Sequence, residues 1–138
     1  MRPFSFFDHT GDVGVIVRGR SLEELFQNAA GALFSLITDR RRICRRLMEA
    51  IRVSAPDLES LLVGWMGELL FLFDARGLLL RSFEFQKLEA GSLEATAWGE
   101  PYQEARHCIK TGLKAVTYHQ IRVEKQGGIW QARLILDI

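Results

Sequence analysis

Two carboxylates, an imidazole and a hydroxyl lie within five residues near the start of the chain, in Asp8-His9-Thr10-Gly11-Asp12. Carboxylates and an imidazole held this close can bind a cation or exchange protons. The same pattern also suits a tight corner in which His9 is hydrogen-bonded and the Thr10 hydroxyl bonds the local backbone. Residues 4–7 and 13–17 on either side are rich in Phe, Val and Ile, which predicts two strands meeting at this corner.

A second acidic position lies at the other end, where Asp137 precedes Ile138. Residues 130–138 alternate as a strand does, so Asp137 points away from the face that carries Leu134 and Leu136. We expect Asp12 to meet Asp137 and the free carboxylate of Ile138 at the corner. Judged on spacing alone, two unrelated surface carboxylates at strand ends are the simpler interpretation, because well-separated acids are common in any chain.

The composition is that of one globular domain covering residues 1–138, with 48% hydrophobic residues, 25% charged residues and a net charge of +1. This balance gives no overall attraction to nucleic acid or membrane. The two cysteines, Cys44 and Cys108, form no metal-binding motif, which argues against zinc and disulfides and favours a reducing cytosol. The chain has no signal-peptide pattern and no run of membrane-spanning length, so we expect a cytoplasmic protein.

Two long helices are predicted between strands. Ser21 and Glu24 form a capping box that starts a helix ending near Thr38. Pro56 and Asp57 open a second helix, residues 58–73, which is apolar around most of its circumference and must be covered by the first helix or by a partner.

Further strands are expected at residues 47–54, 78–88, 93–99, 114–123 and 130–138. Ala95, Ala97 and Gly99 are small at alternate positions, which lets another backbone or a helix approach closely. The sequence therefore predicts a single two-layer α/β domain, with a mixed or mostly antiparallel sheet carrying both helices.

A basic run separates the first helix from the next strand and contains Arg40, Arg41, Arg42, Arg45 and Arg46. Such a run can bind RNA phosphates or an acidic partner. It has no interleaved aromatic residue, however, so a solvated connection is the preferred interpretation.

Several separated segments together resemble the archease family, and the resemblance spans essentially the whole chain. They are Asp8-His9-Thr10-Gly11-Asp12-Val13-Gly14, Ser21-Leu22-Glu23-Glu24-Leu25-Phe26, Asp57-Leu58-Glu59-Ser60-Leu61-Leu62, Glu68-Leu69-Leu70, Trp98-Gly99-Glu100, His107, Lys114-Ala115-Val116-Thr117-Tyr118-His119 and Leu136-Asp137-Ile138. Gly11 stands where the family usually has alanine, which removes no ligand. The arginine run is outside the family pattern.

The resemblance implies an accessory protein for RtcB-type GTP-dependent RNA ligases, which act in tRNA splicing and RNA repair. Such a factor promotes guanylylation of the ligase and its multiple turnover. It is not itself an enzyme, and it contacts tRNA or GTP through the ligase. The resemblance also implies a divalent-metal site at Asp12, Asp137 and the Ile138 carboxylate, with Lys114 and then His107 as candidates for activation. An oxygen-only donor set suits Ca²⁺ first, with Mg²⁺ or Mn²⁺ as alternatives.

Two other functions are compatible with the residues. One is a metal-dependent hydrolase or phosphotransferase that uses Asp12, Asp137 and Lys114 on a phosphorylated substrate; the chain has no P-loop pattern and no nucleophile elbow in its support. The other is an RNA-binding or chaperone-like module built on the arginine run and the broad apolar second helix.

Overall fold

The computed structural model describes residues 1–138 and contains seven strands and two long helices. In chain order the elements are β1 (Phe4–His9), β2 (Asp12–Gly19), α1 (Leu22–Ile37), the short 3-10 helix η1 (Arg40–Arg42), β3 (Leu47–Ser54), α2 (Leu58–Arg76), β4 (Leu78–Leu88), β5 (Ser92–Pro101), β6 (Ala115–Gln126) and β7 (Ile129–Asp137). The predicted α/β class is confirmed, and every predicted helix and strand is present.

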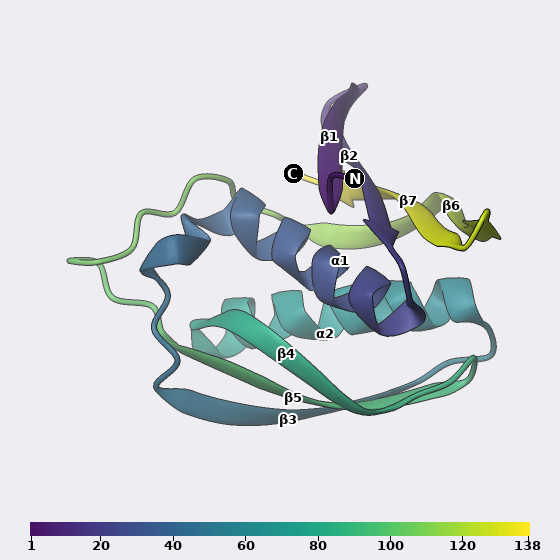
Figure 1. Cartoon of the computed structure of the whole chain (residues 1–138). Helices are drawn as coiled ribbons and strands as arrows, with labels where there is room; N and C mark the ends of the chain where they lie inside the picture. Colours follow the sequence, from purple (N-terminus) through teal and green to yellow (C-terminus); the bar gives the residue numbers. More distant parts are fainter.

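The strands divide between two antiparallel sheets instead of the one sheet expected from the sequence. One sheet has the order β1-β2-β7-β6 and the other the order β3-β5-β4. The helices lie between the sheets (Figure 1), with α1 packed on β2 and β4 and α2 packed on β6 and β3. Two sheets follow from the helix sequences, because helices that are apolar on more than one side need cover on both sides.

The structure identifies what covers the broad apolar surface of α2. Trp65 is fully buried, and its Nε1–H donates to the Phe26 carbonyl at 2.9 Å. Phe71 is the one large apolar side chain of this helix that is markedly exposed, at 57%. The helix therefore offers no wide apolar surface to an unfolded client.

No helix in the structure has both the length and the apolar character needed to cross a membrane.

The predicted helix starts are confirmed in atomic detail. The Ser21 hydroxyl accepts from the Glu24 N–H at 3.1 Å, and the Glu24 carboxylate accepts from the Arg20 N–H at 3.1 Å. Asp57 caps α2 through the Ser60 N–H. The α2 helix runs to Arg76, three residues beyond the predicted end, because Gly77 at φ 66° supplies the left-handed residue that terminates it.

At Gly99, one of the three small residues of β5, the predicted close approach of backbone is confirmed. A Cβ placed on Gly99 would overlap the carbonyl oxygen of Leu79 in the neighbouring strand β4. A strand inside a sheet can relieve such a clash only by breaking its pairing.

We expect Gly99→Ala to lower the free energy of unfolding by about 3 kcal/mol, the upper part of the range for overpacking. Urea denaturation of the purified variant measures this loss. Gly67→Ala is the matched control: a Cβ at Gly67, within α2, meets no atom within 4 Å, so this change should be neutral or stabilising by up to about 1 kcal/mol. An equal loss in both variants would contradict the explanation.

Candidate functional site

The two aspartates from opposite ends of the chain are brought to neighbouring strands. Thr10 and Gly11, at φ 31° and 84°, form the tight turn between β1 and β2, in which His9 pairs with Asp12. Strand β2 pairs with β7 in a register that places Val13 opposite Leu136. The next position along each strand is Asp12 and Asp137, so the ladder sets these two residues side by side.

Both aspartates point to the face of the sheet that lies away from the helices. Leu134 and Leu136 are fully buried against the helices, and alternation turns Asp137 to the opposite side. The predicted direction of Asp137 is therefore confirmed. Both aspartates are partly buried, and Ile138 beside them is 38% exposed.

Little positive charge faces this pair of carboxylates. The single ionic partner of Asp12 is His9, whose Nδ1 lies 4.0 Å from the carboxylate oxygen, and Asp137 has no ion pair. The structure holds no cluster of three or more His, Cys, Asp or Glu side chains arranged around a metal ion. Two unneutralised carboxylates at adjacent positions repel each other, and this repulsion favours a bound cation.

His9 adds an unsatisfied nitrogen to the same place. Its Nδ1 is buried and has no hydrogen-bond partner. The ring of His119 lies 5.4 Å from the ring of His9, because an irregularity in β6 between Thr117 and Arg122 changes the register there. No motif or spacing in the sequence indicates that these two histidines are neighbours.

Lys114 lies directly beside Asp137. Its backbone N–H donates to the Asp137 carbonyl at 2.8 Å, and its side chain is exposed. The ammonium group makes no ion pair in the structure and is therefore available to a partner. The fold thus gathers Asp12, Asp137, Ile138 and Lys114 at one end of the four-stranded sheet.

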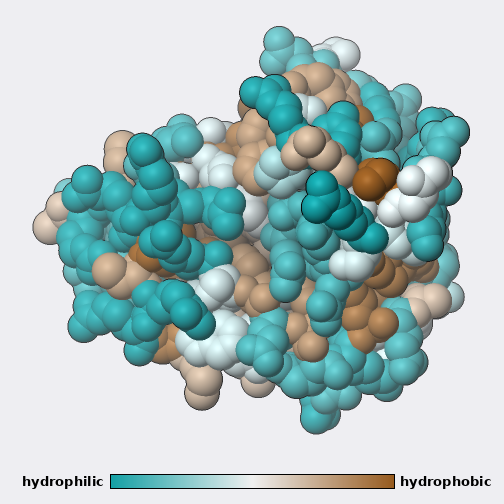
Figure 2. Space-filling model, in the orientation of Figure 1, coloured by the Kyte–Doolittle hydropathy of each residue, from teal (hydrophilic) through white to brown (hydrophobic).

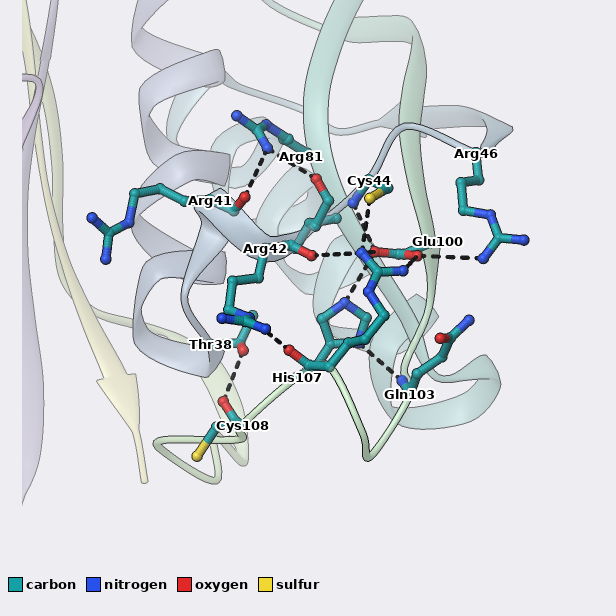
Figure 3. Close-up of polar contacts among 12 residues, drawn as sticks. Thr38, Arg41, Arg42, Cys44, Arg46, Arg81, Glu100, Gln103, His107 and Cys108 are labelled. Atoms are coloured by element: carbon teal, nitrogen blue, oxygen red, sulfur yellow. Dashed lines mark hydrogen bonds and ion pairs between the residues drawn. The ribbon is translucent and has the colours of Figure 1, made fainter.

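His107 belongs to a different cluster, centred on Glu100 (Figure 3). Its ring is buried, with Nδ1 accepting from the Gln103 N–H at 2.9 Å and Nε2 lying 3.0 Å from the Glu100 carboxylate. Since Nδ1 is an acceptor, the hydrogen-bond network assigns the ring proton to Nε2, which donates to Glu100. These contacts give His107 a role in holding the loop between β5 and β6, and they leave its ring inaccessible to a partner.

Glu100 is the one fully buried carboxylate of the chain, at 0% exposure. It accepts from the Cys44 N–H at 2.7 Å and from the Arg106 guanidinium at 2.8 and 3.0 Å. Burial by itself would raise the pKa of Glu100, but the hydrogen bonds from Cys44, Arg106 and His107 outweigh it and lower the pKa below its usual value. Glu100 is therefore an ionised anchor. The sequence feature that could have indicated this role is an acidic residue at the end of an apolar strand in a chain rich in arginine.

The arginine run is a largely exposed connection that makes a few polar contacts. Arg42 donates from Nε to the Arg106 carbonyl at 3.0 Å, and Arg46 lies 3.8 Å from Glu100. Arg41 pairs with Asp39 at 3.0 Å. The prediction of a solvated connection is confirmed for Arg41, Arg42, Arg45 and Arg46, which are exposed. The contacts with Arg106 and Glu100 were not predicted, because both residues lie far along the chain.

The chain is a small α/β domain that displays two aspartates and a lysine at one end of a four-stranded sheet. Comparison with known proteins identifies the family. The model of the Archease protein family matches residues 4–138. The chain is 37% identical to protein archease of Methanosarcina mazei, over 99% of this chain and 97% of that one, and 39% identical to protein archease of Pyrococcus abyssi, over the full length of both.

Two solved structures have the same fold. The solution structure of Methanobacterium thermoautotrophicum protein 1598 matches with a TM-score of 0.84 and 35% identity, covering all of both chains. The crystal structure of an archease described as a possible chaperone, from Thermotoga maritima, matches with a TM-score of 0.65 and 21% identity, covering 100% of this chain and 98% of that one. The chain belongs to the archease family.

Proposed function

We propose that the protein is an accessory factor for an RtcB-type GTP-dependent RNA ligase, promoting guanylylation and multiple turnover of the ligase in tRNA splicing or RNA repair. It acts as a protein cofactor and carries out no ligation itself. The observation that carries this proposal is the pairing of β2 with β7 and of β7 with β6, which sets Asp12, Asp137 and Lys114 together on family-matching positions.

A divalent cation suits this site. Asp12 and Asp137, with the Ile138 carboxylate beside them, would hold it, and the oxygen-only set fits Ca²⁺ first and Mg²⁺ or Mn²⁺ next. When bound, the cation would offset the charge of the carboxylates and leave coordination positions for water or for a group of the ligase. The chain's own contribution is to fix β7 against β2 and to present an exposed lysine, Lys114, whose backbone is bonded to Asp137.

The test is RNA ligation by the cognate ligase under multiple-turnover conditions, with catalytic amounts of this protein. Wild-type protein should raise the number of turnovers per ligase, and Lys114→Ala should remove most of that increase, because the exposed ammonium group, which makes no ion pair within the chain, is lost. Lys87→Ala, which removes an exposed lysine from β4 in the other sheet, should behave as wild type. Ligation that is indifferent to the wild-type protein would overturn the proposal.

The name of the Thermotoga relative suggests a second candidate, a chaperone. The cover on both sides of α2 speaks against a client site on that helix.

A further inference from the structure

A concentration of positive charge surrounds η1 and the loop between β5 and β6, at the end of the molecule where α1 terminates. This basic cluster consists of Arg40, Arg41, Arg42, Arg45, Arg46, Arg81, Arg106 and Lys110. Its members are linked by close contacts, among them Arg81 donating to the Ile43 carbonyl at 3.0 Å and Arg106 to the Arg42 carbonyl at 3.2 Å. The corresponding end of the surface is dominated by hydrophilic side chains (Figure 2).

The positive charge of the basic cluster is not balanced locally. Its nearby carboxylates are Asp39, Glu100 and Glu104, and Glu100 is fully buried, so its charge is not presented to solvent. The whole chain carries a net charge of only +1. The remainder of the molecule is therefore net negative, and this end attracts anions although the overall charge does not.

Arg40 is the member of the basic cluster whose pKa is shifted by partial burial. The pKa of Arg40 is lowered by its burial and by the neighbouring charge of Arg81. Two guanidinium groups nevertheless remain well exposed, Arg41 at 87% and Arg46 at 60%. Arg45 makes no ion pair at all and is also exposed.

The fold adds the aromatic groups that the arginine run lacks in the sequence. The Arg45 guanidinium lies 4.9 Å from the ring centroid of Trp98, on the outer face of the three-stranded sheet. Met48 is paired opposite Trp98 and is 67% exposed. Tyr102, which follows β5, is 39% exposed, and its ring lies 6.1 Å from the ring of the buried His107. Trp98 itself is partly exposed. Guanidinium groups beside aromatic rings that reach the surface are the combination that binds phosphates and stacks on bases.

We propose that the basic cluster together with Trp98 and Tyr102 is a binding surface for single-stranded RNA. Phosphates are held by Arg41, Arg45 and Arg46, and unpaired bases stack on Trp98. An acidic protein surface would satisfy the arginines but would leave the aromatic rings unused, and a duplex would keep its bases out of reach. The inference goes beyond ligase activation and concerns the protein alone, so it can fail without affecting the proposed function.

The experiment is fluorescence anisotropy of a labelled oligouridylate of about 12 nucleotides, a length within the usual site sizes, titrated with the full chain at several salt concentrations. Wild-type protein should bind with an affinity that falls steeply with salt. The double variant Arg45→Gln/Arg46→Gln should bind about tenfold more weakly, and the slope of log K against log salt should be shallower by about 1.4, since each lost phosphate contact on a single strand accounts for about 0.7.

The matched control is Arg20→Gln/Arg122→Gln, which removes the same charge from exposed positions outside the basic cluster. It should bind as wild type does. Stacking has its own readout, because RNA should quench the Trp98 emission of wild-type protein and should cause no such quenching in Trp98→Phe, where the buried Trp65 and the distant Trp130 remain.

Three results would overturn the proposal: equal affinity of the two double variants, unchanged quenching in Trp98→Phe, or equally tight binding of poly-glutamate. The last result would assign the surface to an acidic protein partner.

Discussion

Replacing Asp12 with asparagine is expected to weaken divalent-cation binding by on the order of a hundredfold or more. This loss exceeds the effect usual for a residue that only hydrogen-bonds a metal ligand without touching the metal. Asparagine keeps the shape of the side chain and one oxygen, but it removes the charge that hard cations select. Because Asp137 stands next to Asp12 in the ladder, Asp137→Asn should have a similar effect. Isothermal titration with Ca²⁺, Mg²⁺ and Mn²⁺ measures the affinities and also identifies the preferred ion.

Asp8→Asn provides a closely matched control. Asp8 lies in the same hairpin but pairs with Val13, on the other face of the sheet from Asp12. The same charge is removed four residues away, and the cation affinity should be retained. Bound cation should also stabilise the wild-type fold, by about 2.7 kcal/mol at a hundred times the dissociation constant, and should not stabilise Asp12→Asn. Equal losses of affinity in Asp8→Asn and Asp12→Asn would show that only general surface charge matters.

Truncating Glu100 to alanine is expected to lower the free energy of unfolding by about 3–5 kcal/mol, the usual cost of breaking a buried ion pair. The change leaves the Arg106 guanidinium, the His107 Nε2–H and the Cys44 N–H without their acceptor. In a domain of this size the melting temperature should fall by roughly 10–20 °C. Glu84→Ala, at an exposed position of β4, is the control and should change stability little. A small effect of Glu100→Ala would mean that water replaces the carboxylate at little cost.

The lowered pKa of Glu100 gives this loss a pH dependence. A carboxylate with a lower pKa in the folded state than its ordinary value of 4.5 stabilises the fold fully above that value. Its contribution declines as the pH falls below 4.5 and the carboxylate of the folded protein becomes protonated. The difference in stability between wild type and Glu100→Gln should therefore be constant near neutral pH and shrink in the acid range. Urea denaturation at several pH values tests this, and a difference that grows in acid would contradict the assignment.

The sequence by itself determined the elements whose signals are local. The Ser21 and Asp57 caps, the tight turn at Thr10 and Gly11, and the alternation that turns Asp137 away from the helices could all be predicted from a few neighbouring residues. These features depend on hydrogen bonds and backbone conformations within one or two turns of chain, so no distant partner is needed to specify them. The matched family motifs likewise pointed to Asp12, Asp137 and Lys114 without any structure.

Only the tertiary structure decided which distant segments meet. It divided the strands into two sheets, brought His119 against His9, moved His107 from the candidate site to the buried Glu100, and placed Trp98 beside Arg45. Each of these contacts joins residues from different elements, and each depends on strand register and on how the helices are covered, which no local pattern encodes. The arginine run is exposed, as its sequence predicts, but its contacts with Glu100 and Trp98 could not be predicted, because these residues lie more than fifty positions further along the chain.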